Sequence, residues 1–347
     1  MSALKQITIV GGGLAGLTLG IGLRQQGVPV TVWEAGRYPR HRVCGEFISG
    51  QGQATLARLG LRELFVQAGA RNAETAAFFS TKAAAPAREL PARALCLSRF
   101  LMDDLLAQQF RTLGGDLREN ERWRDEYSTE GVVRASGRRL QTVVNNGRWF
   151  GLKAHARNVP LVADLEMHVS PHGYVGICRL NDEEVNVCGL FRRTTNATNV
   201  PAQWQERLRG PAGSLLQHRL ASAKFEMDSF CSVAGLFLKP QRASLQTGCC
   251  VGDALTMIPP VTGNGMSMAF ESAEIAVEPL AAYSRGETPW AEAQQNIARR
   301  CDQTFAQRLV WAAWLQRMMF APGLQNVLVF LAPRGSWLWR AMFAKTR

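Results

Sequence analysis

The sequence predicts an α/β protein in which a parallel sheet is interleaved along the chain with an antiparallel sheet, followed by a helical C-terminal segment. Three observations predict it. A glycine-rich turn joins a strand-like run to a helix-like run near the N terminus, five runs between residues 74 and 193 alternate apolar and polar side chains, and residues 308–347 have a helical pattern broken at Pro322 and Pro333. With 347 residues, of which 46% are hydrophobic, the chain can bury a sizeable core as one large or two interleaved domains.

The first element, residues 7–36, has the pattern of a strand, a tight turn, a helix and a second strand. Gly11 allows the sharp turn, Gly13 lets a diphosphate approach the backbone, and Gly16 lets the helix pack close to the strand. The phosphates would lie at the positive helix N terminus. Glu34 closes the second strand, where its carboxylate suits the two hydroxyls of an adenosine ribose. The pattern predicts a Rossmann-like domain for FAD or NAD; the alternative is a glycine-rich turn without a ligand.

A second glycine-bearing turn, within residues 251–276, favours FAD. Asp253 suits a hydroxyl of a ribityl chain, and the glycines of residues 263–265 allow the backbone to lie flat against a ring. The helix that follows would point its positive end at the pyrimidine edge of the flavin, where negative charge appears on reduction.

Together these two turns resemble those of the FAD-dependent aromatic-ring hydroxylases and their geranylgeranyl-reductase-like relatives. The resemblance implies an FAD-binding domain of the glutathione-reductase type and a substrate-binding antiparallel sheet, visited alternately by the chain. We expect the FAD-binding domain to comprise residues 1–72, 97–146 and 244–285, the substrate domain residues 73–96 and 147–243, and the C-terminal helices residues 286–347.

The resemblance also implies a set of FAD contacts. "LSRFLMDDLL" (97–106) is similar to the family's arginine-led helix after a strand, which assigns Arg99 to the cofactor. With the residues that flank the motifs, the expected contacts are Gly11, Gly13, Leu14, Ala15, Gly16, Glu34, Ala35, Arg42, Gly45, Glu46, Arg99, Gly252, Asp253, Pro260, Gly263, Asn264, Gly265 and Met266.

The loop "RVCGEFISG" (42–50) resembles the cysteine–glycine loop of geranylgeranyl reductases, which runs beside the flavin. Cys44 is therefore either a thiol that donates a proton or tunes the flavin, or a small packing residue. Gly45 would permit close approach to the ring. Glu46 would contact the cofactor or cap a helix that begins near Gln51, and we favour these roles over proton transfer.

NAD(P)H is the expected external reductant. The family's short Asp-Gly motif, which touches both cofactors, is represented by "RASGRRL" (134–140), where Ser136 replaces the aspartate. The span from Gly115 to Ser136 is short, so we expect a trimmed sheet excursion there.

On the substrate side, strand-like runs occupy residues 74–81, 149–156, 161–169, 173–180 and 184–193. Lys153, His155, Tyr174 and Cys178 could alternate onto the flavin-facing side; the alternative is that they are outward-facing or satisfied core groups. The spacing of histidines and cysteines fits no metal site, and no nucleophile–base pair is evident.

The net charge of +12 would suit nucleic acid, an anionic membrane or an acidic substrate, but no nucleic-acid motif is present. The start lacks the pattern of a signal peptide and the eight cysteines show no framework spacing, so we expect free thiols in the cytoplasm. The basic, tryptophan-rich tail suits peripheral contact with the inner face of the membrane, or helices packed on the substrate domain.

Three functions follow. The first is an NAD(P)H-driven monooxygenase acting on an apolar aromatic, polyketide-like or lipid substrate. The second is a reductase of carbon–carbon double bonds in isoprenoids or other lipids, in which Cys44 or Tyr174 supplies the proton. The third, ranked last, is a non-catalytic flavin- or lipid-binding protein. A flavin halogenase is less favoured because the sequence has no W-x-W-x-I-P motif.

Overall fold

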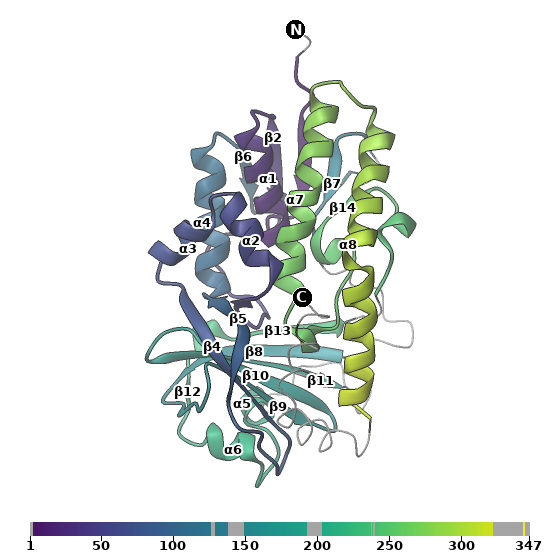
Figure 1. Cartoon of the computed structure of the whole chain (residues 1–347). Helices are drawn as coiled ribbons and strands as arrows, with labels where there is room; N and C mark the ends of the chain where they lie inside the picture. Colours follow the sequence, from purple (N-terminus) through teal and green to yellow (C-terminus); the bar gives the residue numbers. More distant parts are fainter. Residues whose placement is uncertain are drawn as a thin grey trace.

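The computed structural model describes residues 3–125, 129–137, 149–192, 203–236, 238, 240–321 and 343. Two sheets organise the described chain: a parallel sheet surrounded by long helices, and a larger sheet that lies beyond one end of those helices (Figure 1). This is the α/β fold with an interleaved second sheet that the sequence predicts.

The parallel sheet has the strand order β14-β7-β1-β2-β6. Its outermost strand β14 comes from a segment more than 100 residues after its neighbour β7, so the chain leaves this domain and returns to it. The strands are β1 (Ile7–Val10), β2 (Val30–Glu34), β6 (Asp116–Glu119), β7 (Val132–Arg134) and β14 (Cys249–Cys250).

Helices cover this sheet because their apolar sides face it. The helix α1 packs between α4 and α7, and the shorter α2 packs on α7. The helices of this part are α1 (Leu14–Gln25), α2 (Gln51–Arg58), α3 (Arg62–Gln67), α4 (Arg99–Thr112) and α7 (Gly265–Ser284). The predicted arginine-led helix is thus confirmed as α4, with Ser98 accepting a hydrogen bond from the Leu101 amide at its N terminus.

The second sheet has nine strands and the main order β12-β8-β11-β10-β9-β4-β5-β3, with β13 also pairing with β8. Its strands are antiparallel except for β4 and β9, which are parallel, so the predicted antiparallel sheet is in fact mixed. The strands are β3 (Phe47–Ile48), β4 (Arg71–Phe79), β5 (Arg88–Cys96), β8 (Trp149–Arg157), β9 (Leu165–Ser170), β10 (Gly173–Arg179), β11 (Glu184–Arg192), β12 (Lys224–Phe225) and β13 (Cys231–Leu236).

All five runs predicted as strands form strands, namely β4, β8, β9, β10 and β11. The short strand β3 falls inside the segment 1–72 that we assigned to the cofactor domain, yet it pairs with β5 of the second sheet. The loop that carries Cys44 therefore leads directly from one sheet into the other.

The second sheet has two distinct faces. The face that we call the near face carries Lys153, His155 and Tyr174 and lies against the loop 42–50 and the turn 257–263. The opposite one, the far face, is covered by α5 (Trp204–Arg209) and α6 (Leu215–Arg219) through an apolar cluster. Strand alternation separates the two sets of side chains.

The helix α8 (Trp290–Met319) packs along α7 and reaches the second sheet with its C-terminal end. A buried ion pair fixes the two helices, since Arg308 binds both carboxylate oxygens of Glu271 at 2.7 and 2.8 Å. The helix ends before Pro322, and most of the predicted tail lies outside the described residues. Among those described, no helix is long and apolar enough to cross a membrane.

Candidate active site

In the glycine-rich turn between β1 and α1, backbone atoms pack tightly against Gly11 and Gly16, whereas the space beside Gly13 is open. A side chain on Gly16 would collide with the carbonyl oxygen of Gly11, and one on Gly11 (φ 112°) with the backbone of Ala135 and Ser136. A Cβ on Gly13 would meet no atom within 4 Å. The turn thus leaves open space where Gly13 meets the N terminus of α1, the arrangement that a diphosphate requires.

Glu34 ends β2 beside this turn and is held by the backbone. Its carboxylate accepts hydrogen bonds from the amides of Gly12 at 3.0 Å and Gly36 at 2.8 Å. Burial would raise the pKa of Glu34, but Arg40 and Arg42, together with the Gly36 amide, outweigh burial and lower the pKa. The group is an anion that faces the diphosphate turn, where it can accept bonds from ribose hydroxyls.

The second glycine-bearing turn lies against the first. A Cβ on Gly252 would come within 2.7 Å of the Ala15 side chain, and Gly252 has a φ of 63° that favours glycine. Its amide donates to Ser272 Oγ at 2.9 Å. Gly263, also at φ 63°, leaves no room for a side chain because Phe47 occupies that space. Two turns about 240 residues apart therefore meet at the start of α1, as predicted.

The helix α7 begins at Gly265 directly after this turn. Its first turn has no side-chain cap, and a Cβ on Gly265 would meet only Ile258 at 3.9 Å. Asn264 and Met266 are buried beside it, and Pro260 begins a short 3₁₀ helix. The positive end of a 20-residue helix, with space before it, fits the pyrimidine edge of a flavin.

The two predicted arginines converge on one buried carboxylate that the sequence reasoning missed. Arg99 binds Asp103 with Nε at 2.9 Å and Nη2 at 2.8 Å, and Arg42 Nε lies 3.2 Å from the same group. Burial would lower the pKa of Arg99, but Asp103 and the half-buried thiol of Cys44 outweigh burial and raise the pKa. The i to i+4 spacing of Arg99 and Asp103 on α4 was a signal that could have revealed the pair.

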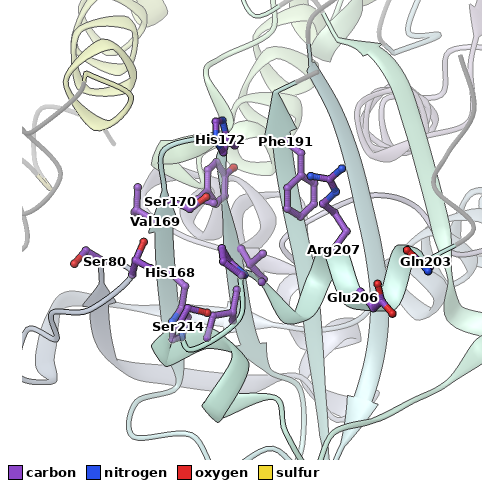
Figure 2. Close-up of a pocket in the computed structure, with 16 residues that line it drawn as sticks. Ser80, His168, Val169, Ser170, His172, Phe191, Gln203, Glu206, Arg207 and Ser214 are labelled. Atoms are coloured by element: carbon purple, nitrogen blue, oxygen red, sulfur yellow. The ribbon is translucent and has the colours of Figure 1, made fainter. Parts of the chain in front are cut away.

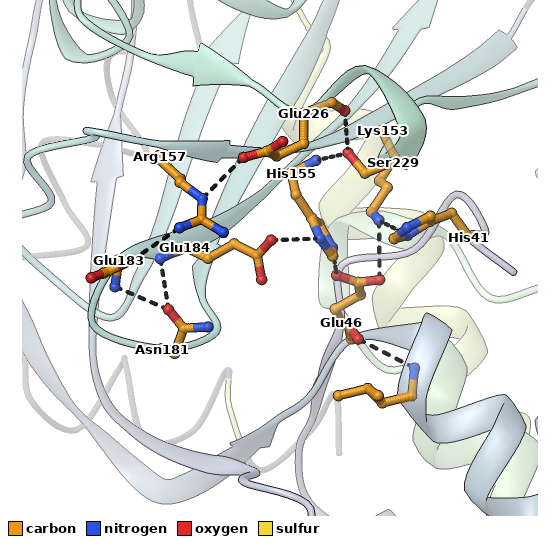
Figure 3. A network of polar contacts seen from close by, with 12 residues as sticks. His41, Glu46, Lys153, His155, Arg157, Asn181, Glu183, Glu184, Glu226 and Ser229 are labelled. Atoms are coloured by element: carbon orange, nitrogen blue, oxygen red, sulfur yellow. Dashed lines mark hydrogen bonds and ion pairs between the residues drawn. The ribbon is translucent and has the colours of Figure 1, made fainter. Parts of the chain in front are cut away.

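Glu46 is wholly buried and faces the second sheet (Figure 3). It accepts a hydrogen bond from the Arg99 amide at 2.8 Å, bonds to His155 Nε2 at 2.7 Å, and lies 3.4 Å from Lys153 Nζ. Its backbone φ is 61°, which is uncommon for a residue other than glycine. The prediction that it caps the helix at Gln51 is wrong, because the contacts of Glu46 direct its side chain to α4 and β8.

The near-face contacts of Glu46 continue to the surface and to His41. His155 Nδ1 lies 3.2 Å from Glu184, which is partly exposed, and Lys153 Nζ lies 2.9 Å from His41 Nδ1. We call Glu46, Lys153, His155, His41 and Glu184 the buried network. It joins the cysteine loop to the substrate sheet.

The pKa values in the buried network follow from burial and its charges. Burial would lower the pKa of His155, but hydrogen bonds to Glu184 and Glu46 outweigh it and raise the pKa. Burial lowers the pKa of His41 to about 4, with help from Lys153 and His155. Burial would raise the pKa of Glu46, but the bond to His155 and the charge on Lys153 lower it. Neutral His41 therefore accepts a hydrogen bond from Lys153.

The network also contains three groups of the kind that bind metals. Ligand atoms of His41, Glu46 and His155 lie within 4.8 Å of one another, a juxtaposition that the sequence analysis did not foresee. Lys153, itself 0% exposed, contacts two of the three. Its ammonium group supplies the positive charge that a metal ion would otherwise bring to this carboxylate.

Tyr174 lies on the near face in a separate, apolar cluster. It packs with Val169 and Leu190 of the same sheet and with Met257 and Val261 of the second turn. Lys153, His155 and Cys178 share this face, as predicted, whereas the prediction that this face is turned toward the flavin stays a prediction. Cys44 packs against the core of the cofactor domain instead, and the two predicted proton donors belong to different clusters.

Several predicted contacts have positions but no assigned role. Leu14 and Ala15 are buried at the start of α1, Ala35 is exposed after Glu34, and Asp253 lies in the short 3₁₀ helix after β14. Gly45 is half-buried beside Phe47. Their contacts with a cofactor stay predictions, as does the predicted division into domains. Residues 138–140 of the "RASGRRL" stretch lie outside the described residues.

Comparison with known proteins agrees with this geometry. Residues 5–145 match the FAD binding domain family. No curated protein matches the sequence.

Solved structures with the same fold are numerous. The p-nitrophenol 4-monooxygenase PnpA from Pseudomonas putida DLL-E4 is 15% identical with a TM-score of 0.75, covering 99% of this chain and 98% of that one. PqsL from P. aeruginosa, solved with 2-aminobenzoylacetate, is 17% identical with a TM-score of 0.71, and the match covers 95% of this chain and 100% of PqsL. The flavin-dependent brominase Bmp2 is 15% identical with a TM-score of 0.73, and the match covers 98% of this chain and 92% of Bmp2.

The matched domain and the open, positively polarised turns both fit FAD. At these identities the neighbours establish the fold, which this chain shares with PnpA, PqsL and Bmp2. The turns at Gly13 and Gly265 would hold the diphosphate and the ring edge, and Glu34 the adenosine ribose.

Proposed function

We propose that this chain, with an FAD-binding domain in the fold of flavin-dependent monooxygenases and halogenases, is an NAD(P)H-driven FAD monooxygenase of an apolar small molecule. The substrate class is aromatic, polyketide-like or lipid. Monooxygenase PnpA is named for p-nitrophenol and PqsL was solved with 2-aminobenzoylacetate, so aromatic compounds are the first to test.

The observation that carries the proposal is the buried apolar cluster that the near face forms with the second glycine turn. Val169, Leu190, Met257 and Val261 surround Tyr174, which is 9% exposed. Bound FAD supplies the oxygen activation. The contribution of this chain is to position an apolar substrate against the ring edge at α7 and to keep water away from it.

The thiol of Cys44 is not required in this proposal. Its packing against the core of the cofactor domain, near Arg99, fits a role in holding the loop 42–50 in place. The same half-buried thiol is the observation that favours the second candidate, a double-bond reductase in which Cys44 or Tyr174 donates the proton to the substrate.

Oxygen labelling separates the two functions. FAD-loaded protein is supplied with NADPH or NADH, ¹⁸O₂ and a panel of aromatic and isoprenoid compounds, and the products are analysed by mass spectrometry. A monooxygenase places one labelled oxygen in the product and consumes NAD(P)H faster when substrate is present. Turnover of an isoprenoid without oxygen, driven by dithionite, would replace this proposal with the reductase.

Peripheral membrane contact is also a proposal. On α8, Val310 is 68% exposed and Trp314 is 47% exposed, with Trp311 packed against Trp314. An exposed tryptophan close to the exposed Arg317 suits a membrane interface. Co-sedimentation with anionic vesicles, compared between the protein and Trp314→Glu, tests this contact.

A further inference from the structure

A pocket of about 400 Å³ opens mainly on the far face of the second sheet, with His168 and Val175 in its lining (Figure 2). Its apolar wall consists of Val175, Phe191 and Leu216, and α5 contributes exposed Glu206 and Arg207. The members of the buried network do not line this pocket, but Val169 and Tyr174 of the near-face cluster border it.

His168 lines the pocket and is only 4% exposed. Its ring stacks on Phe79 with centroids 4.3 Å apart and an interplanar angle of 6°. Nε2 bonds to Glu166 Oε2 at 3.0 Å, whereas Nδ1 has no hydrogen-bond partner among the described residues. A buried polar atom that lines a pocket and lacks a partner is unfavourable unless a ligand or water satisfies it.

The neighbours of His168 determine which nitrogen carries the proton. Glu166 also accepts a hydrogen bond from the Val162 amide at 2.7 Å and lies 3.0 Å from Arg219 Nε, so it is held as an acceptor. Nε2 must therefore donate to Glu166. Burial lowers the pKa of His168, which keeps the ring neutral. Nδ1 then carries a lone pair that can only accept a hydrogen bond, on a side chain that lines the pocket.

We propose that this pocket is a second binding site, for a neutral aromatic alcohol whose hydroxyl donates to Nδ1 of His168. The apolar wall takes the ring, with Phe191 beside it, and the volume is within the range of small-molecule sites. A ligand with a carboxylate is disfavoured, because its negative charge would approach the lone pair of His168 Nδ1 while the carboxylate of Glu166 already lies at the other ring nitrogen. The proposal does not rest on the proposed oxidoreductase activity, although Val169 and Tyr174 border both places.

Three probes of one size test the proposal: 2-naphthol, 2-methylnaphthalene, which lacks the donor, and 2-naphthoate, which is an anion. Binding is followed by methyl NMR of the FAD-loaded protein. Val175 and Leu216 report the far face, and Leu190 and Val233 report the near face. We expect 2-naphthol to shift the far-face methyls with an affinity at least about tenfold higher than either analogue.

The variant His168→Phe keeps an aromatic ring against Phe79 but removes the acceptor. It should abolish the preference for 2-naphthol over 2-methylnaphthalene, while His172→Phe at the exposed rim should keep it. Should His168→Phe fail to fold, Leu216→Trp, which fills the pocket, is measured instead and should lose binding of all three probes. Equal affinities for the three probes, or shifts confined to Leu190 and Val233, would overturn the proposal.

Discussion

The carboxylate of Glu46 and the imidazole of His155 are 2.7 Å apart, although 109 residues separate them in the chain. Both are almost fully buried, and Lys153 lies beside the carboxylate with no exposed surface. This contact ties the loop that leads from the cofactor domain to the face of the sheet on which we place the substrate.

Glu46→Gln tests the strength of this connection. The amide cannot compensate the buried ammonium of Lys153, so we expect the free energy of unfolding to fall by about 3–5 kcal/mol. Chemical denaturation of apoprotein measures it. The matched control is Glu183→Gln, since Glu183 pairs with Arg157 at the surface and should change stability by less than about 1 kcal/mol. A similar small effect at both positions would contradict a structural role for the network.

Gly13→Val tests the diphosphate turn. Because a Cβ at Gly13 meets no protein atom, the variant should fold with a melting temperature close to that of the parent protein, yet bind FAD at least about tenfold more weakly. Flavin fluorescence quenching measures the affinity. In contrast, Gly16→Val must displace the backbone of Gly11 and should reduce stability itself. If Gly13→Val bound FAD as the parent protein does, the turn would not hold the diphosphate.

The stability of the network should depend on pH through His155. Its pKa is raised in the folded state, so the stabilisation from its protonation is fully present below the unfolded pKa of about 6.5 and is lost as pH rises through the folded pKa. The destabilisation caused by His155→Gln should therefore be larger at pH 6 than at pH 9. Urea denaturation at both values measures it, with His218→Gln on the exposed side of α6 as the control. An effect of His155→Gln that grew with pH would refute the assignment.

Cys44→Ser distinguishes a structural thiol from a proton donor. The serine hydroxyl is close in size to the thiol and keeps a polar group near Arg99, so we expect unchanged FAD affinity and, under the monooxygenase proposal, turnover within about twofold of the parent protein. Steady-state NAD(P)H consumption with an aromatic substrate measures it. A loss of turnover by two orders of magnitude or more, with FAD still bound, would support the reductase.

The sequence predicted those parts of the fold and site that depend on local patterns. The glycine spacing at residues 11–16 fixes a turn by itself, and period-two alternation placed Lys153 and His155 on one face of β8. The run 97–106 likewise predicted α4. In each of these examples the predictive sequence pattern lies within a single turn, strand or helix.

What the sequence did not predict are contacts between distant elements. In the sequence, Glu46 follows a loop and directly precedes the short strand β3. Nothing in these neighbouring residues indicates that His155 and Lys153 contact its carboxylate. His168 was missed for the same reason, since its partners depend on the packing of several segments. For Asp103 only the contact with Arg42 is of this kind, because the pair with Arg99 had a local signal in its i to i+4 spacing. The parallel pairing of β4 with β9 arises because the chain leaves and re-enters the sheet.

The central claim is that the turns at residues 11–16 and 252–265 hold one FAD between them. Isothermal titration of apoprotein with FAD, and in parallel with NAD⁺, tests it most directly. We predict one FAD per chain, an affinity for FAD at least about a hundredfold above that for NAD⁺, and weaker FAD binding in Gly13→Val. Folded apoprotein that took up no FAD, or preferred NAD⁺, would contradict the account.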